Sequence, residues 1–257
     1  MPDHHHTPDM PPTAAANPRL DPRLFMSFPS VMARLFSIMN PVLVQGQGLV
    51  VQFIGTQYGD GVSTIARDFA LTTAQHIAGP VLLLDFDWGQ DSHFIHFQRI
   101  FKQQGANINL ELPLHLDIDL SGLLGMPGGP SPASCPLRFD QLPDLGLILG
   151  RTDFSQTVTP APTLSILNRP DIWALLRGKF ATIVVDSPPS SQSFDGIVLS
   201  GAMDAVVLVV RAESTRSPVA AHLRDRLTAR GAPLAGVVLN QRRFYIPKFI
   251  YRFLDRL

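Results

Sequence analysis

Short apolar runs recur along the 257-residue chain, and segments with helical periodicity separate them. Runs made almost entirely of Val, Leu and Ile are typical of parallel strands that helices cover on both faces. Strands that alternate with helices predict an α/β fold with a doubly wound, mostly parallel sheet. The expected strands are residues 49–54, 81–85, 145–149, 181–186, 205–210 and 234–239. The expected helices are residues 30–40, 63–77, 91–104, 165–179, 191–202 and 216–230.

Proline-rich segments interrupt this pattern at the start and in the middle of the chain, which has 23 prolines. We expect residues 1–24 to be a disordered tail and residues 25–257 to be a single α/β domain. Inside the domain, residues 105–162 are expected to be an irregular excursion with one strand. The tail carries His4–His6. These histidines are either a weak metal site or a solvated run without function.

Charge and composition narrow the function. The 21 basic and 21 acidic residues cancel, so the chain lacks the basic footprint of a nucleic-acid-binding protein. Its one cysteine, Cys135, cannot form an internal disulfide, which fits a reducing cytoplasm. No apolar run reaches the roughly 18–20 residues of a membrane span. The N-terminus lacks the basic-then-apolar order of a signal peptide. We therefore expect a cytoplasmic protein.

The stretch GTQYGDGVST, residues 55–64, follows the first expected strand and leads into an expected helix. Strand, glycine-rich turn, Ser-Thr and helix is the layout of a P-loop, whose backbone N–H groups and helix dipole face a phosphate. Thr64, or alternatively Ser63, is placed to ligate Mg²⁺. The other interpretation is an ordinary turn that uses glycine for its positive φ. The candidate nucleotide contacts are Gly59, Asp60, Gly61, Val62, Ser63 and Thr64.

Polar side chains stand where three of the expected strands end. Asp85 and Asp87 lie on one side of an extended segment at a strand tip, where ligands bind in open α/β sheets. Asp186 ends another strand, so the three carboxylates could face a metal-bound phosphate. The alternative is that these aspartates cap the next helix or turn. Asn240 follows the last strand, where its amide could read a nucleobase edge; asparagine there is otherwise a turn former.

Five stretches, taken in order, resemble the motifs of the bacterial tyrosine kinase family of capsule and exopolysaccharide synthesis, within the MinD/ParA-like P-loop group. They are GDGVST, LLLDFDWG, VDSPPSSQSFD, VVLVVRAESTR and GVVLNQRRFYIP. The resemblance covers residues 30–257, with a poor match across 90–144, and implies a P-loop NTPase-like sheet. It also implies roles for particular residues. These are phosphate and magnesium contacts at Gly59, Gly61, Ser63 and Thr64, metal and catalytic acids at Asp85 and Asp87, a Walker B acid (also a magnesium ligand) at Asp186, and a base contact at Asn240.

The chain departs from the family pattern at one decisive position. Val62 stands where the family has the lysine that pairs with the β- and γ-phosphates. Phosphoryl transfer depends on positioning and charge stabilisation. Losing a fixed cation therefore implies weaker binding of ATP or ADP with Mg²⁺, and it implies impaired catalysis. Arg67 or Arg151 could replace the lost charge. The chain has just three tyrosines, Tyr58, Tyr245 and Tyr251, so the family's tyrosine-rich C-terminal tail is missing. The family's pattern for ring assembly is reduced to Arg34.

The resemblance implies a regulatory, kinase-like protein that partners a membrane polysaccharide co-polymerase or synthase at the inner face of the plasma membrane. It also implies a homo-oligomer. Two alternatives are an active MinD/ParA-type ATPase that positions a membrane complex, and a scaffold that binds no nucleotide. The basic and aromatic stretch 245–257 predicts a C-terminal helix. That helix either contacts an anionic membrane surface or packs on the sheet.

Overall fold

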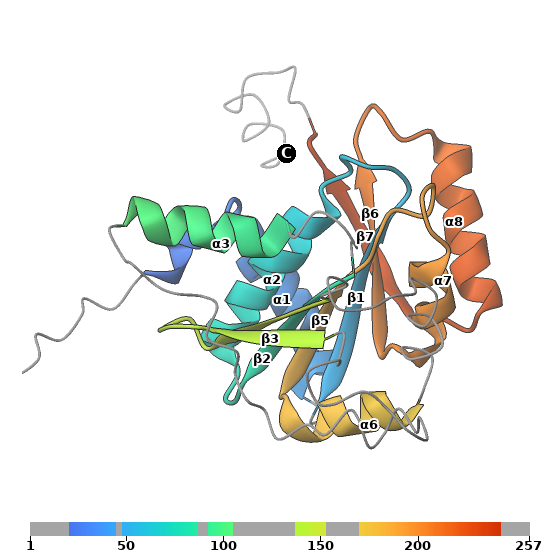
Figure 1. Ribbon diagram of the computed structural model, residues 1–257. Helices are drawn as coiled ribbons and strands as arrows, with labels where there is room; N and C mark the ends of the chain where they lie inside the picture. Colours follow the sequence, from blue (N-terminus) through green and yellow to red (C-terminus); the bar gives the residue numbers. More distant parts are fainter. Residues whose placement is uncertain (1–20, 45–47, 87–91, 105–136, 153–169, 243–257) are drawn as a thin grey trace, which may run out of the picture.

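The computed structural model describes residues 21–44, 48–86, 92–104, 137–152 and 170–242 (Figure 1). Its centre is a seven-stranded sheet in the order β3-β4-β2-β5-β1-β6-β7. Neighbouring strands run parallel except β3, which is antiparallel to β4. The expected α/β fold with a mostly parallel sheet is therefore confirmed. The strands are β1 (Leu49–Gly55), β2 (Val81–Asp85), β3 (Leu137–Leu142), β4 (Leu147–Thr152), β5 (Thr182–Asp186), β6 (Ala205–Arg211) and β7 (Leu234–Asn240).

Helices cover both faces of the sheet (Figure 1). One face packs against η1 (Pro22–Phe25), α1 (Pro29–Val44), α2 (Val62–His76) and α3 (Ser92–Gln103). The other face packs against α6 (Pro170–Lys179), α7 (Asp195–Leu199), the single turn η3 (Ser200–Ala202) and α8 (Ser217–Ala229). Among the described residues, none of the helices combines the length and apolarity that crossing a bilayer requires.

The packing of strand β1 explains why its sequence is apolar at almost every position. Successive side chains point to opposite faces of a strand. Val51 and Phe53 therefore join the core beneath α2, whereas Val50 and Ile54 join the core beneath α6 and α7. Since both faces are buried, neither tolerates the polar alternation of a half-exposed strand.

Helix α1 is fastened to α2 through the carboxylate of Asp68. Asp68 lies on α2, and its Oδ2 atom accepts hydrogen bonds of 2.8 Å from the backbone N–H groups of Ser27 and Phe28. Those groups stand immediately before α1, where a chain turning into a helix needs acceptors. Burial raises the pKa of the Asp68 carboxyl, while these two bonds and the charge of Arg67 partly oppose that rise.

Two segments differ from the sequence expectations. Strand β3 lies within residues 105–162, where we expected only one strand, and Arg151 of β4 pairs with Asp140 of β3 at 2.9 Å. Residues 22–24 belong to η1 although the disordered tail was expected to reach residue 24. The reason is Phe25, which is 1% exposed and packs its ring at a tilt against two aromatic rings of α3. The remainder of the tail and the C-terminal helix expected over 245–257 lie outside the described residues.

Candidate functional site

The loop between β1 and α2 borders an open cavity of about 250 Å³. Residues 57–64 line it, together with Arg67, Ser92, Ser187 and Pro189. The loop turns through Gly59 and Gly61, whose φ angles are +86° and +88°. Gly61 is the N-cap of α2 and makes no side-chain capping hydrogen bond. The first turn of α2 thus combines the positive end of a helix dipole with an uncapped start, which favours an anion.

Asp60 braces this loop from within. Its side chain is 2% exposed, and Oδ2 accepts hydrogen bonds of 2.9 Å from Thr56 N, Thr56 Oγ1 and Gln57 N. The other carboxylate oxygen, Oδ1, accepts a bond of 3.2 Å from the hydroxyl of Thr215. Asp60 lines the cavity, but the structure gives its carboxylate a structural role in holding the loop.

Asn240 holds the same loop from the end of β7. Its Nδ2 atom donates to the carbonyl of Asp60 at 2.9 Å, and its Oδ1 atom accepts from the N–H of Gln241. The side-chain amide of Gln241 donates to the carbonyl of Gly59 at 3.2 Å. A β-carbon on Gly61 would overlap the Asn240 amide nitrogen. Asn240 therefore acts on the loop backbone here, and its contact with a nucleobase stays a prediction.

The three residues that follow Gly61 face different surroundings. Val62 is 8% exposed and belongs to the apolar core beside α2. Ser63 and Thr64 are half-buried, and both line the cavity. The hydroxyls expected near magnesium are thus at the cavity wall. Val62 borders the same cavity but offers it only an apolar side chain, which is also part of the core.

Arg67 brings a positive charge to this cavity from α2, one helical turn beyond Ser63. It lines the cavity although only 6% of it is exposed. Its Nε atom has no hydrogen-bond partner among the described residues. Burial lowers the pKa of the Arg67 guanidinium, and the negative charges of Asp68, Asp186 and Asp85 oppose that change. Arg151, the other expected substitute, instead pairs with Asp140 and lies 4.2 Å over the ring of Phe94.

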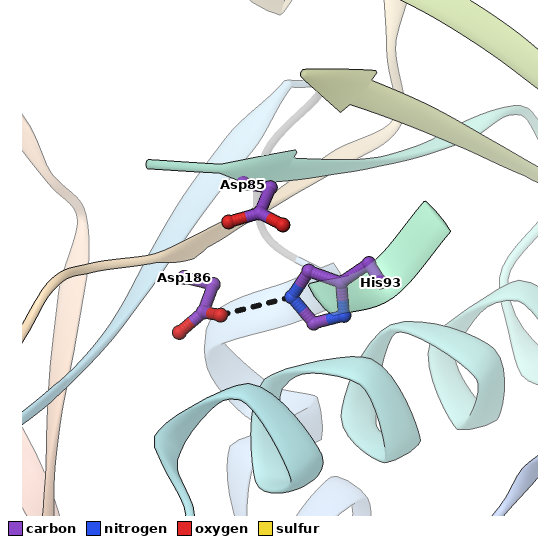
Figure 2. Close-up of side chains that lie close together, drawn as sticks. All are labelled: Asp85, His93 and Asp186. Carbon is purple, nitrogen blue, oxygen red and sulfur yellow. Dashed lines mark hydrogen bonds and ion pairs between the residues drawn. The ribbon is translucent and has the colours of Figure 1, made fainter. Parts of the chain in front are cut away.

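Asp85 and Asp186 come together because β2 and β5 are adjacent and in register, so that these two residues are direct partners. They are 5% and 0% exposed. His93, in the first turn of α3, joins them, and its Nε2 atom lies 2.9 Å from Asp186 Oδ2. Figure 2 shows the two carboxylates and the imidazole edge facing a common point. One donor atom from each of the three residues lies within 4.8 Å of the other two.

The sequence analysis did not identify His93. The available signal was a histidine in the first turn of the helix that follows the Asp85 strand. Asp87, expected to act with Asp85, lies outside the described residues.

Comparison with known proteins supports the fold. No protein-family model matches the sequence, and neither does any curated protein. Among solved structures, the VpsO kinase domain is 24% identical with a TM-score of 0.57, and the match covers 84% of this chain and 96% of that one. The Escherichia coli tyrosine kinase ETK domain is 15% identical with a TM-score of 0.61, covering 90% and 86%. The Pyrococcus furiosus cell division ATPase MinD is 16% identical with a TM-score of 0.51, covering 81% and 80%. The chain therefore has the α/β fold of P-loop kinase domains and MinD.

Proposed function

We propose that this chain is a kinase-like P-loop protein that binds ATP or ADP weakly and has impaired or lost phosphoryl transfer. The observation that carries the proposal is a loop whose backbone has the shape for binding phosphate but whose side chain at position 62 is uncharged. The loop keeps left-handed glycines and an uncapped helix start at a cavity, while Val62 belongs to the apolar core. Backbone amides at such a start can hold phosphate. An isopropyl group cannot stabilise charge that develops on it.

The oxygen donors around the cavity fit the magnesium ion that accompanies a nucleotide. Mg²⁺ prefers oxygen ligands, and the hydroxyl directly after the lysine position of a P-loop is the one that contacts it. That hydroxyl belongs to Ser63, which the sequence offered as the alternative to Thr64. The carboxylates of Asp85 and Asp186 lie at the ends of nearby strands. A bound Mg²⁺ would neutralise phosphate charge there. The protein's own contribution is to orient the phosphates along the first turn of α2.

Arg67 explains why we propose weak binding rather than none. Of the residues that the structure describes, it is the basic one on the cavity wall. The negative charges of Asp186 and Asp85 lie close enough to act to raise its pKa, so they balance part of its positive charge. A guanidinium whose charge is partly balanced by nearby carboxylates is a poorer phosphate ligand than a lysine reaching over the loop.

We further propose that the chain is a regulatory partner of a membrane polysaccharide co-polymerase or synthase. The five motifs that resemble the exopolysaccharide kinase family support this, as does a fold shared with the VpsO and ETK kinase domains. Homo-oligomer formation and a membrane contact through residues 245–257 belong to the same proposal.

Calorimetry of the full chain with ATP and ADP, with and without Mg²⁺, tests the nucleotide site. We expect measurable ATP binding that Mg²⁺ strengthens, and no phosphate on Tyr245 or Tyr251 after incubation with Mg·ATP. Gly61→Val is the matched negative control, since a side chain there would need a left-handed backbone and would displace Asn240. Absence of ATP heat would support the scaffold. Rapid hydrolysis abolished by Asp85→Ala would support the MinD-type ATPase.

A genetic experiment tests the regulatory role. Deleting the gene is expected to reduce polysaccharide output, and wild type is expected to restore it. Asp85→Asn should restore it equally well if phosphoryl transfer is dispensable. Failure of Asp85→Asn to complement, with the protein folded and present at normal level, would contradict a role without catalysis.

A further inference from the structure

We propose that Asp85, His93 and Asp186 form a binding site for a first-row transition-metal dication of the Zn²⁺ or Mn²⁺ type. The site takes the metal without nucleotide, so the inference does not rest on the proposed function. It differs from the magnesium site expected from sequence because one of its donors is an imidazole.

Convergence of three donor residues supports the site. Asp85 and Asp186 are partners across adjacent parallel strands, and His93 reaches them from the first turn of α3. One donor atom from each residue lies within 4.8 Å of the other two, and this spacing leaves room for an ion at coordinating distance. Typical metal distances to imidazole nitrogen and carboxylate oxygen are about 2.0–2.2 Å, so donors around one ion lie about 3–4 Å apart. In Figure 2 the donors already face this common point.

Burial and charge supply independent support. His93 and Asp186 are fully buried and Asp85 nearly so. Asp186 Oδ1 and His93 Nδ1 have no hydrogen-bond partner among the residues that the structure describes. Buried polar atoms of this kind are uncommon. The atoms that face the common point are Asp186 Oδ2 and His93 Nε2, which share one hydrogen bond of 2.9 Å that a bound metal ion would replace. Two acidic side chains this close repel each other when both are ionised, and a dication bound between them would relieve that repulsion.

The mixture of nitrogen and oxygen donors indicates the metal class. Imidazole suits zinc and other transition metals, whereas magnesium is held almost entirely by oxygen. Three protein ligands also leave at least one position open, as in sites where the metal contacts an exchangeable ligand. That open position would adjoin the cavity, because Ser92 and Ser187, the sequence neighbours of His93 and Asp186, line it.

The test is equilibrium dialysis of the nucleotide-free full chain against Zn²⁺, Mn²⁺ and Mg²⁺. All proteins carry His4→Ala, His5→Ala and His6→Ala, so that the N-terminal histidines cannot contribute. We expect one equivalent of Zn²⁺ or Mn²⁺ to bind more tightly than Mg²⁺. His93→Gln should weaken binding by at least about tenfold, since losing even a residue that supports a metal ligand costs that much.

His96→Gln is the matched control on the same helix. His96 lies one turn further along α3, where its Nε2 atom donates to the carbonyl of Phe25 at 3.2 Å. Glutamine can keep that bond, and metal affinity should not change. Equal affinity of the His93→Gln and parent proteins would overturn the proposal, as would Mg²⁺ binding as tightly as Zn²⁺ and Mn²⁺.

A second measurement avoids substitution of the buried histidine. Pulsed electron paramagnetic resonance of Mn²⁺ bound to the parent protein should show coupling to one imidazole nitrogen. Bound Mn²⁺ without nitrogen coupling, or no stoichiometric binding of either transition metal, would also overturn the assignment. ATP binding retained in such a protein would leave the proposed function standing, so the two failures are distinguishable.

Discussion

The side chain of Val62 packs directly against Gly55: a β-carbon added to Gly55 would lie 2.7 Å from the Val62 Cγ2 atom. The end of β1 and the start of α2 therefore fit together only because one position is glycine and the other is a compact apolar residue. Val62, which matches the lysine of the resembling motif, is therefore part of the packing between a strand and a helix. A longer residue at position 62 must leave that contact, and the cavity is the open side.

Val62→Lys is expected to raise the affinity for Mg·ATP about tenfold, because a charge-assisted hydrogen bond of about 1.5–3 kcal/mol becomes available. The same substitution should lower the free energy of unfolding by about 1–2 kcal/mol, since buried methyl groups are lost. Calorimetry and urea denaturation measure the two effects. Val62→Met, long but uncharged, is the control and should show no gain in affinity. Equal affinity of the Lys and Met variants would mean that the ammonium does not reach the phosphates.

Arg67→Met is expected to weaken ATP binding about tenfold if the guanidinium supplies the remaining cation at the cavity. Met keeps much of the apolar volume of the arginine stem, so the comparison isolates the charge. Arg67→Lys should recover part of the affinity. Binding is measured by calorimetry on protein whose folded fraction is known, because removing Arg67 leaves Asp186 and Asp85 with less compensation. Unchanged affinity in Arg67→Met would restrict Arg67 to balancing the two acids.

The raised pKa of Asp68 predicts a pH dependence of stability. Burial is its main cause, so the folded protein holds the proton at a higher pH than the unfolded chain, whose carboxyl has the ordinary value of 3.8. Stability is thus favoured below pH 3.8 and falls as pH rises towards the folded-state pKa. Asp68→Asn, which keeps an acceptor for Ser27 and Phe28, should gain stability relative to wild type across this range.

Denaturation of wild type and Asp68→Asn between acid and neutral pH measures that difference. Asp68→Ala, which loses the acceptor, should be less stable than Asp68→Asn by about 1–3 kcal/mol. A stability difference between wild type and Asp68→Asn that does not change with pH would refute the raised pKa.

Asn240→Ala separates a base contact from a role in the loop. Since Asn240 donates to the carbonyl of Asp60, its loss should weaken the binding of ATP and of inorganic triphosphate by the same factor. A residue that only read the base would affect ATP and leave triphosphate unchanged. Competition binding with both ligands measures the ratio. Gln241→Ala, which removes the neighbouring bond to Gly59, is expected to give a smaller effect in the same direction.

Sequence patterns predicted the parallel strands well because burial on both faces leaves a continuous apolar run. They missed β3 because its sequence LRFDQL contains three polar residues and so lacks the continuous apolar run of the central strands. The pairing of Asp85 with Asp186 depends on β2 and β5 being neighbours, which a linear sequence does not state. Likewise, only the packing distinguishes Arg67, which lines the cavity, from Arg151, which is held by Asp140.

Two constraints exclude a side chain at position 61. Its backbone is left-handed, and the space that a side chain would fill is occupied by Asn240. The first turn of α2 and the last described strand are consequently interlocked, although about 180 residues of chain separate Asp60 from Asn240. A chain truncated before β7 should therefore lack the bond that holds the loop between β1 and α2. We expect the cavity to form only after β7 has joined the sheet.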